Sequence, residues 1–252
     1  MGLEGKGAVA GQSGGQGRKG IDAFWLKIFA IVGMTLDHIG IVFGDHMPLA
    51  AKTALYALGG LTFPIMAYLL GEGFRHTRNV KKYALRLLFF AILTQIPYSW
   101  TLFKQANVLF TLLLGLLLLW LYERIGDKPA FYLLLIGVVL LSAFCDWGVV
   151  GPVMVFLYYI LRGQGWNREL IPWLLPLLAM ALPGLYSLVA QGDISVLPNI
   201  AFALVGCSLT VPLLHAYNGQ RGRSMKYLFY AYYPVHIAVL GLLRGLLFGQ
   251  WL

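Results

Sequence analysis

The sequence has few charged residues. They make up only 12% of its 252 positions, about half of the roughly 25% that soluble globular domains carry. Hydrophobic residues make up 59%, and the mean hydropathy is +0.74. A chain of this composition has too few polar side chains to cover a water-soluble fold. The composition therefore excludes a soluble globular protein and indicates an integral membrane protein.

Cysteine and acidic residues are also scarce. The two cysteines, Cys145 and Cys207, lie in or beside apolar stretches and form no C-x-x-C pair, which argues against a zinc site or a disulfide framework. Only 10 acidic residues accompany 19 basic ones. The basic residues form short clusters between apolar runs, where they set membrane topology. We expect both cysteines to pack in the interior, and we expect no metal and no nucleic-acid partner.

The chain divides into a tail and one membrane domain. Residues 1–20 contain eight glycines and no apolar run, a composition typical of a flexible segment. From there on, apolar stretches follow one another with short polar connections. We therefore predict a flexible Gly-rich tail at 1–20 and a single transmembrane domain at 21–252.

The apolar runs are continuous, as in LFTLLLGLLLLWLY from Leu109 to Tyr122. Strands of a membrane barrel would alternate apolar and polar residues, so the pattern predicts an all-α bundle of transmembrane helices. Several runs are short, which suggests tilted or re-entrant segments near a site. We count nine candidate spans, at residues 24–43, 49–70, 83–101, 107–123, 129–145, 148–162, 170–190, 194–217 and 227–249.

The basic residues indicate the orientation of these spans. With the N-terminus inside, 16 of the 19 basic residues fall on the inner side, and only Lys52, Lys104 and Arg244 fall on or near the outer side. The positive-inside rule therefore predicts that the N-terminus is inside and the C-terminus outside. The inner basic residues are Lys6, Arg18, Lys19, Lys27, Arg75, Arg78, Lys81, Lys82, Arg86, Arg124, Lys128, Arg162, Arg168, Arg221, Arg223 and Lys226.

Ionisable residues inside the spans are functional candidates, because they are costly there. Asp37 and His38 lie in the first span, and His236 lies near the middle of the last one, after Tyr232 and Tyr233. Desolvation favours the neutral imidazole that a general base needs. His38 either takes that role or bonds a partner group in the bundle interior, and the residues alone leave both readings open.

Further polar residues fall in the outer half of the bilayer, near the depth of His38. They are Gln95, Asn107 at the start of the fourth span, and Asp146 at an outer turn. Neighbouring helical residues point about 100° apart, so Asp37 does not face His38 and more readily bonds a group on another helix. The convergence of these residues in depth indicates a polar site, although depth does not establish contact.

A second cluster lies at the inner end of the second span and contains both signs of charge. Such a cluster either anchors the topology against anionic lipid headgroups or docks a phosphorylated ligand such as a nucleotide or CoA, for which Arg is well suited. Charge alone does not separate the two readings. The cluster comprises Glu72, Arg75, His76, Arg78, Lys81 and Lys82.

The membrane domain predicted at 21–252 contains no G-x-S-x-G, Walker A, H-E-x-x-H or dinucleotide motif. The sequence does, however, resemble the TraX family of integral membrane proteins. The resemblance rests on LKIFAIVGMTLDHIGIVF, FPIMAYLLGEGFRHT, KYALRLLFFAILTQIPY, NVLFTLLLG and FYAYYPVHIAVLGLL, in this order between about Lys27 and Leu247. That family is similar to a broader group of transmembrane acyltransferases, in which an intramembrane His near the start of the chain is the proposed catalytic residue. His38 is the matching position.

The resemblance implies an acetyltransferase that uses cytosolic acetyl-CoA as co-substrate. The implied catalytic residues are His38, Asp37, His236 and Asn107, with Glu72, Gln95, Tyr233 and Asp146 in support. Gln95, Asn107 or Tyr233 would donate a hydrogen bond to the developing oxyanion. The implied CoA-binding residues are Arg75, Arg78, Lys81, Lys82 and Arg86.

The acceptor implied by the resemblance is the N-terminal amine of a peptide or pilin, or a hydroxyl or amine of a glycan, reached from the outer side. The implied location is a bacterial inner membrane, with lipids as partners. Two other classes remain open. A proton-coupled transporter would use the intramembrane His and Asp as a relay, although no internal repeat is visible. A non-catalytic subunit of a secretion or conjugation machine would leave the polar residues unexplained.

Overall fold

The computed structural model describes residues 20–224 and 226–251, without the side chains of residues 226 and 227. The tail predicted at 1–20 therefore lies outside the described residues, apart from Gly20. Within the described part of the chain, the backbone forms nine helical rods and no strand beyond isolated bridges. The prediction of an all-α bundle is confirmed, and each of the nine predicted ranges corresponds to a helical rod.

Six of the rods each contain one α-helix, which in the first rod is followed by a short 3-10 turn. They are α1 (Ala23–Phe43, followed by the 3-10 turn η1, Gly44–His46), α4 (Val80–Thr101), α5 (Val108–Arg124), α6 (Lys128–Ser142), α7 (Val150–Ile160) and α12 (Lys226–Phe248). The remaining three rods are interrupted. They consist of α2 (Leu49–Gly59) with α3 (Thr62–His76); α8 (Asn167–Pro176), η2 (Leu177–Ala181) and α9 (Leu182–Gln191); and η3 (Ile194–Val196), α10 (Leu197–Ala201), η4 (Phe202–Gly206) and α11 (Cys207–His215).

Five rods are long and apolar enough to cross a membrane by themselves: 23–46, 49–76, 167–191, 194–215 and 228–248. By contrast, α5, α6 and α7 have 17, 15 and 11 residues, fewer than the about 20 of a full span. These short helices agree with the short apolar runs in the sequence. The chain is thus a polytopic membrane protein, and the helices in the middle of its sequence are short.

Polar side chains define where several helices begin. Asp22, Asn79, Asn107 and Asp127 each accept a hydrogen bond from a backbone N–H in the first turn of α1, α4, α5 and α6, at 2.9–3.3 Å. Each thereby satisfies one of the free N–H groups of a helix start. The polar residues that separate the apolar runs in the sequence are therefore also the caps of the helices.

The second rod breaks between α2 and α3, beside the first span. A Cβ atom on Gly59 would lie 2.5 Å from the Cβ atom of Asp37, and one on Gly60 would collide with the carbonyl oxygen of Phe202. Across this contact, a Cβ atom on Gly206 would lie 2.6 Å from the carbonyl oxygen of Ala57. The π-helical turn η4 thus packs backbone to backbone against the break, which only glycine permits.

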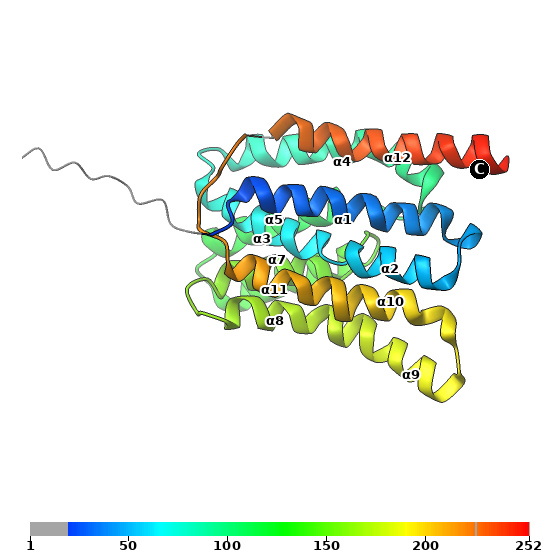
Figure 1. Ribbon diagram of the computed structural model, residues 1–252. Helices are drawn as coiled ribbons and strands as arrows, with labels where there is room; N and C mark the ends of the chain where they lie inside the picture. The colour runs from blue at the N-terminus through cyan, green and yellow to red at the C-terminus, as the bar shows by residue number, and fades with distance from the viewer. Residues whose placement is uncertain (1–19, 225, 252) are drawn as a thin grey trace, which may run out of the picture.

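The helices run side by side along one common direction (Figure 1), and α1 begins at the end of the bundle opposite to the end where α12 finishes. At the end where α1 begins, Glu72 pairs with Arg162 at 3.7 Å, and the Tyr159 hydroxyl donates to Glu123 at 2.8 Å. These contacts join the ends of α3, α5 and α7. The predicted inner basic residues of the described chain gather at this end, which the positive-inside rule assigns to the cytosolic side.

Candidate functional site

Two cavities lie along α1, and one face of this helix contributes a residue to each of them. Lys27 lines the first cavity and His38 lines the second. The two residues are eleven positions apart, which is three helical turns and about 16 Å of rise. We call the cavities the inner pocket and the His38 cavity.

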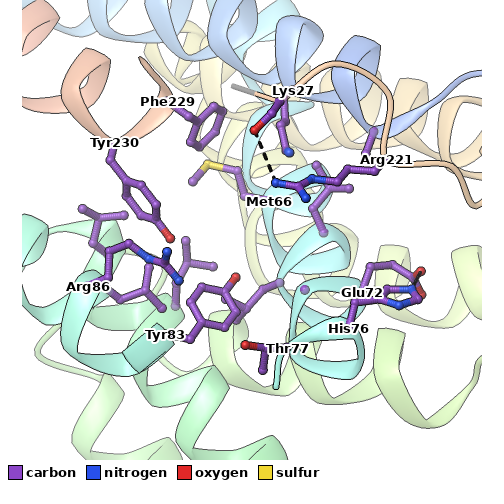
Figure 2. A pocket seen from close by; sticks show the side chains of 18 of the residues that line it. Lys27, Met66, Glu72, His76, Thr77, Tyr83, Arg86, Arg221, Phe229 and Tyr230 are labelled. Atoms are coloured by element: carbon purple, nitrogen blue, oxygen red, sulfur yellow. Dashed lines mark hydrogen bonds and ion pairs between the residues drawn. The ribbon is translucent and has the colours of Figure 1, made fainter. Parts of the chain in front are cut away.

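The inner pocket has a volume of about 550 Å³ and opens at the basic end of the bundle. Figure 2 shows that cationic side chains from three elements reach it: Lys27 from α1, Arg86 from α4 and Arg221 from the loop before α12. Its other lining residues include the aromatic Tyr83, Tyr217, Phe229 and Tyr230, the polar Glu72, His76, Thr77 and Ser224, and the apolar Met66, Leu69, Leu70, Leu87, Leu109 and Leu112.

Arg86 lies between two aromatic rings of the inner pocket. Its guanidinium carbon lies 5.6 Å from the ring centre of Tyr83 and 5.7 Å from that of Tyr230 (Figure 2), so two aromatic faces hold it in place. Its Nε atom is buried and has no hydrogen-bond partner among the described residues. An unpaired buried donor on a fixed guanidinium favours an anionic ligand at this position.

Tyr217 and Glu72 also line the inner pocket. Glu72 pairs with Arg75 at 3.6 Å and with Arg162 at 3.7 Å. Burial, together with the nearby Glu72 and Asp22 carboxylates, raises the pKa of Tyr217 to about 12. The Tyr217 phenol therefore stays neutral at physiological pH and can donate a hydrogen bond to a ligand.

The His38 cavity is much smaller, with a volume of about 40 Å³. It lies deeper in the bundle, where α1, the break between α2 and α3, the start of α5, the loop before α7, η4 and α12 meet. Its lining residues are Met34, Asp37, His38, Gly59, Thr62, Phe63, Met66, Val108, Asp146, Trp147, Phe202 and Tyr233.

A chain of hydrogen bonds fixes the His38 imidazole. His38 Nδ1 lies 2.7 Å from His236 Nε2, and His236 Nδ1 lies 2.9 Å from the carbonyl oxygen of Tyr232. Because a carbonyl oxygen only accepts, His236 Nδ1 carries a proton, and in the neutral imidazole its Nε2 accepts from His38 Nδ1. These assignments, inferred from the partners, leave the lone pair of His38 Nε2 free to act as a base.

A second chain holds the same part of α12 against α1. The Thr35 hydroxyl donates to the carbonyl oxygen of Ile31 at 2.7 Å, and so the Tyr232 hydroxyl donates to Thr35 Oγ1 at 2.6 Å. The ring of Tyr232 also stacks on the ring of His236, with centroids 4.9 Å apart and planes 12° apart. Tyr232 therefore orients His236 through its carbonyl, its ring and its hydroxyl.

Two polar atoms around the His38 cavity are buried and lack a hydrogen-bond partner within the described chain: Asp37 Oδ1 and the Tyr233 hydroxyl. Asp146 also lines the cavity, and its carbonyl oxygen accepts a hydrogen bond from the Thr111 hydroxyl. Unpaired buried polar atoms are costly to a fold, so their presence beside a free imidazole nitrogen is typical of a site that a substrate completes.

Met66 connects the two cavities, because its side chain lines both of them. It is 8% exposed and lies on α3. Met66 is thus shared by the basic pocket and the cavity that holds His38. The arrangement can admit an anionic ligand from the inner end and bring its far end to the imidazole.

The comparison with known sequences agrees with this architecture. Residues 23–244 match the family model described as TraX protein. The chain belongs to the TraX family. It is also 33% identical over 238 residues to the probable fimbrial assembly protein FimC, serogroup H1, of Dichelobacter nodosus. The aligned region covers 86% of this chain and 93% of that protein. No solved structure matches.

The TraX-family chain brings together only some of the predicted catalytic residues. His38 and His236 bond each other, and Asp37, Asp146 and Tyr233 line the same cavity. The amide of Asn107 lies elsewhere: its Nδ2 donates to the Ala91 carbonyl and to Gln95 Oε1, each at 2.8 Å, and its Oδ1 caps α5.

The side-chain amide of Gln95 is also engaged in hydrogen bonds within the protein. Its Nε2 donates to Ser99 Oγ and to the Gln105 carbonyl oxygen, both at 2.9 Å. The amide protons of Gln95 and Asn107 are therefore engaged in joining α4 to the start of α5. Of the three predicted oxyanion donors, only Tyr233 reaches the His38 cavity with a free hydroxyl.

The predicted CoA-binding set is divided too. Arg86 lines the inner pocket, whereas Arg75 pairs with Glu72, and Arg78, Lys81 and Lys82 are exposed and line neither cavity. The other cationic residues that line the inner pocket are Lys27 and Arg221. The three-turn spacing between Lys27 and His38 could have identified Lys27 from the sequence, but no local pattern marks Arg221, Met66 or Trp147.

Proposed function

We propose that this chain is a membrane-embedded acetyltransferase. It moves an acetyl group from acetyl-CoA, bound at the inner pocket, to an amine or hydroxyl of an acceptor that reaches His38 from the outer side. The observation that carries this proposal is the hydrogen-bond chain from the Tyr232 carbonyl through His236 to His38, which leaves His38 Nε2 as a positioned base in a cavity next to a basic entrance.

The inner pocket suits the donor by its size and its chemistry. Its volume of about 550 Å³ is in the range of pockets that hold small molecules and cofactors. Lys27, Arg86 and Arg221 offer charge to the phosphates of CoA, and Tyr83, Phe229 and Tyr230 offer aromatic surface to its adenine. A thioester arm that passes Met66 would meet the imidazole about three helical turns deeper.

The chain's own residues supply the acid–base chemistry. His38 Nε2 accepts the proton of the acceptor N–H or O–H as the new bond to the acyl carbon forms, while Tyr233 donates a hydrogen bond to the acyl oxygen. The carbon–sulfur bond then breaks, and His38 returns the proton to the thiolate of CoA. A variant route, in which His38 first takes the acetyl group on Nε2, uses the same residues.

The acceptor is inferred from the relative that this chain resembles. The similarity to a relative named as a probable fimbrial assembly protein supports a pilin or another peptide amine, and a glycan amine or hydroxyl is the second choice. The family resemblance supports the bacterial inner membrane as the location.

Transfer of labelled acetyl groups tests the proposal. Purified protein, labelled acetyl-CoA and short peptides with free or blocked N-termini are combined for the wild type and for His38→Ala. We expect label on the free-amine peptide and its loss in His38→Ala. His46→Ala is the matched control, because His46 is exposed at the outer end and stacks on Phe248, away from both cavities.

The transfer experiment, combined with a measurement of thermal stabilisation by CoA, distinguishes a second function. The unpaired Asp37 carboxylate beside a histidine pair also favours a proton-coupled transporter. Thermal stabilisation by CoA without peptide labelling would retain the acyltransferase and direct the search to a sugar or lipid acceptor. Neither stabilisation nor transfer, in folded protein, would contradict the acetyltransferase and favour the transporter.

A further inference from the structure

The His38 cavity has one aromatic wall. The rings of Phe63 and Trp147 stack with centroids 4.1 Å apart and planes 16° apart, and Phe202 lies 5.7 Å from Trp147. Phe63 is 2% exposed and Phe202 9%, so both are packed from behind. The wall leaves a cavity of about 40 Å³, a few times the roughly 10–15 Å³ that one water molecule needs.

Trp147 reaches this wall through a backbone conformation that bulky residues rarely adopt. Its φ angle is 65°, in the left-handed region where non-glycine residues are uncommon. Backbone hydrogen bonds hold the loop on both sides: Asp146 N–H donates to the Ala106 carbonyl at 2.7 Å, and Gly151 N–H donates to the Trp147 carbonyl at 3.1 Å. The fold thus accepts strain at the residue whose ring closes the cavity.

The first turn of α7 lies close to both wall residues at Gly151. A Cβ atom on Gly151 would lie 3.1 Å from Phe63 Cζ and 3.3 Å from Trp147 Cβ. The tip of the Phe63 ring and the Cβ atom of Trp147 therefore both lie close to Gly151, where a larger residue would not fit. Stacked and buried rings thus bound the small space beside His38.

We propose that Trp147 and Phe63 limit the transferred acyl group to two carbons, because their rings fill the space that a longer chain would need beside His38. This inference rests on the proposed acetyltransferase function and adds the residues that set its acyl specificity. An acetyl group places one methyl beyond its carbonyl carbon. Each further methylene has to displace a ring of the wall, and a hydrophobic pocket discriminates by about 10- to 200-fold per methylene.

The test compares acetyl-CoA, butyryl-CoA and hexanoyl-CoA in the purified protein, with a free-amine peptide as acceptor. In the wild type we expect butyryl transfer to be at least about 10-fold slower than acetyl transfer. Trp147→Gly removes the ring without a backbone penalty, because glycine adopts positive φ freely. We expect this variant to transfer butyryl and acetyl groups at similar rates.

Phe63→Leu provides a second enlargement of the cavity, should Trp147→Gly fold poorly. Its matched control is Phe131→Leu, since Phe131 is also buried in a helix but belongs to a separate cluster with Leu118 and Val138. Thermal stabilisation by each acyl-CoA gives a readout that needs no acceptor. We expect the stabilisation by hexanoyl-CoA, relative to that by acetyl-CoA, to increase in Trp147→Gly and Phe63→Leu. In Phe131→Leu this ratio should stay as in the wild type.

The outcomes separate the inference from the function on which it rests. Equal use of acetyl-CoA and hexanoyl-CoA by the wild type, or an unchanged preference in both enlarged variants, would overturn the role of Trp147 and Phe63 while the acyltransferase stands. If no acyl-CoA stabilises the protein or serves as donor, the proposed function itself fails, and the inference fails with it.

Discussion

At the scale of single residues, the account depends on which nitrogen of His38 carries the proton. The Tyr232 carbonyl oxygen fixes the His236 tautomer, and His236 fixes that of His38. His236 is therefore a positioning residue for the base. Its removal would leave His38 free to rotate and to change tautomer without changing the residues that hold the donor.

We predict that His236→Ala lowers kcat by about 10²–10⁴, as is typical when a base loses its tautomer or its orientation. The KM for acetyl-CoA should stay within a few-fold of the wild type, because His236 does not line the inner pocket. His236→Gln keeps an acceptor near His38 Nδ1 and should retain part of the activity. Equal losses in kcat and donor binding would indicate a merely structural role.

Arg86 provides the corresponding prediction for the donor. Arg86→Gln should raise the KM for acetyl-CoA by about 10- to 100-fold, the effect of losing a hydrogen bond to a charged group worth about 1.5–3 kcal/mol. Lys81→Gln is the control, because Lys81 is exposed and lies outside the inner pocket. Steady-state kinetics with varied acetyl-CoA separate the two; a larger effect at Lys81 would place the donor on the surface cluster instead.

The sequence predicted which residues are polar and buried, but not which of them meet. His38 and His236 both stood out as ionisable residues in apolar runs, whereas their 2.7 Å contact depends on how α1 packs against α12. Helical spacing shows which residues of one helix share a face, and it cannot show which faces of two helices touch. For the same reason, depth alone did not reveal that Asn107 caps α5 and bonds Gln95.

At the scale of elements, the central feature is the glycine contact between the break at Gly60 and η4. Gly60→Ala should lower the free energy of unfolding by about 1–3 kcal/mol, the usual cost of overpacking, because the new methyl would meet the Phe202 carbonyl oxygen. Gly137→Ala in α6 is the control, since a Cβ atom there has no neighbour within 4 Å. Thermal melts in detergent compare the two; equal stability would argue against the close approach.

The element boundaries followed from the sequence wherever polar caps interrupt apolar runs. All nine predicted spans correspond to helical rods, and α7 is shorter than its predicted range of 148–162, with Val150–Ile160. The residues before it are used in the loop that carries Asp146 and Trp147. The π turns η2 and η4 could not be predicted, because they depend on packing between rods and leave no mark in hydropathy.

At the scale of the whole molecule, the start of α1 and the end of α12 lie at opposite ends of the bundle, as the positive-inside prediction requires. We predict that a cysteine introduced by Arg78→Cys reacts with a membrane-impermeant reagent only from the cytosolic side, and one introduced by Gln250→Cys only from the other side. Both positions are exposed, and the native Cys145 and Cys207 are buried, which keeps the background low. Labelling of both positions from the same side would contradict the nine-span arrangement.

The most direct test of the whole account is a sided transfer experiment in membrane vesicles from cells that produce the protein. Labelled acetyl-CoA is added outside inverted vesicles, which expose the inner pocket, and outside right-side-out vesicles, which do not. The account predicts that membrane material becomes labelled only in inverted vesicles and that His38→Ala abolishes the labelling. Labelling that is independent of vesicle orientation, or that survives His38→Ala, would contradict transfer from the inner pocket through His38.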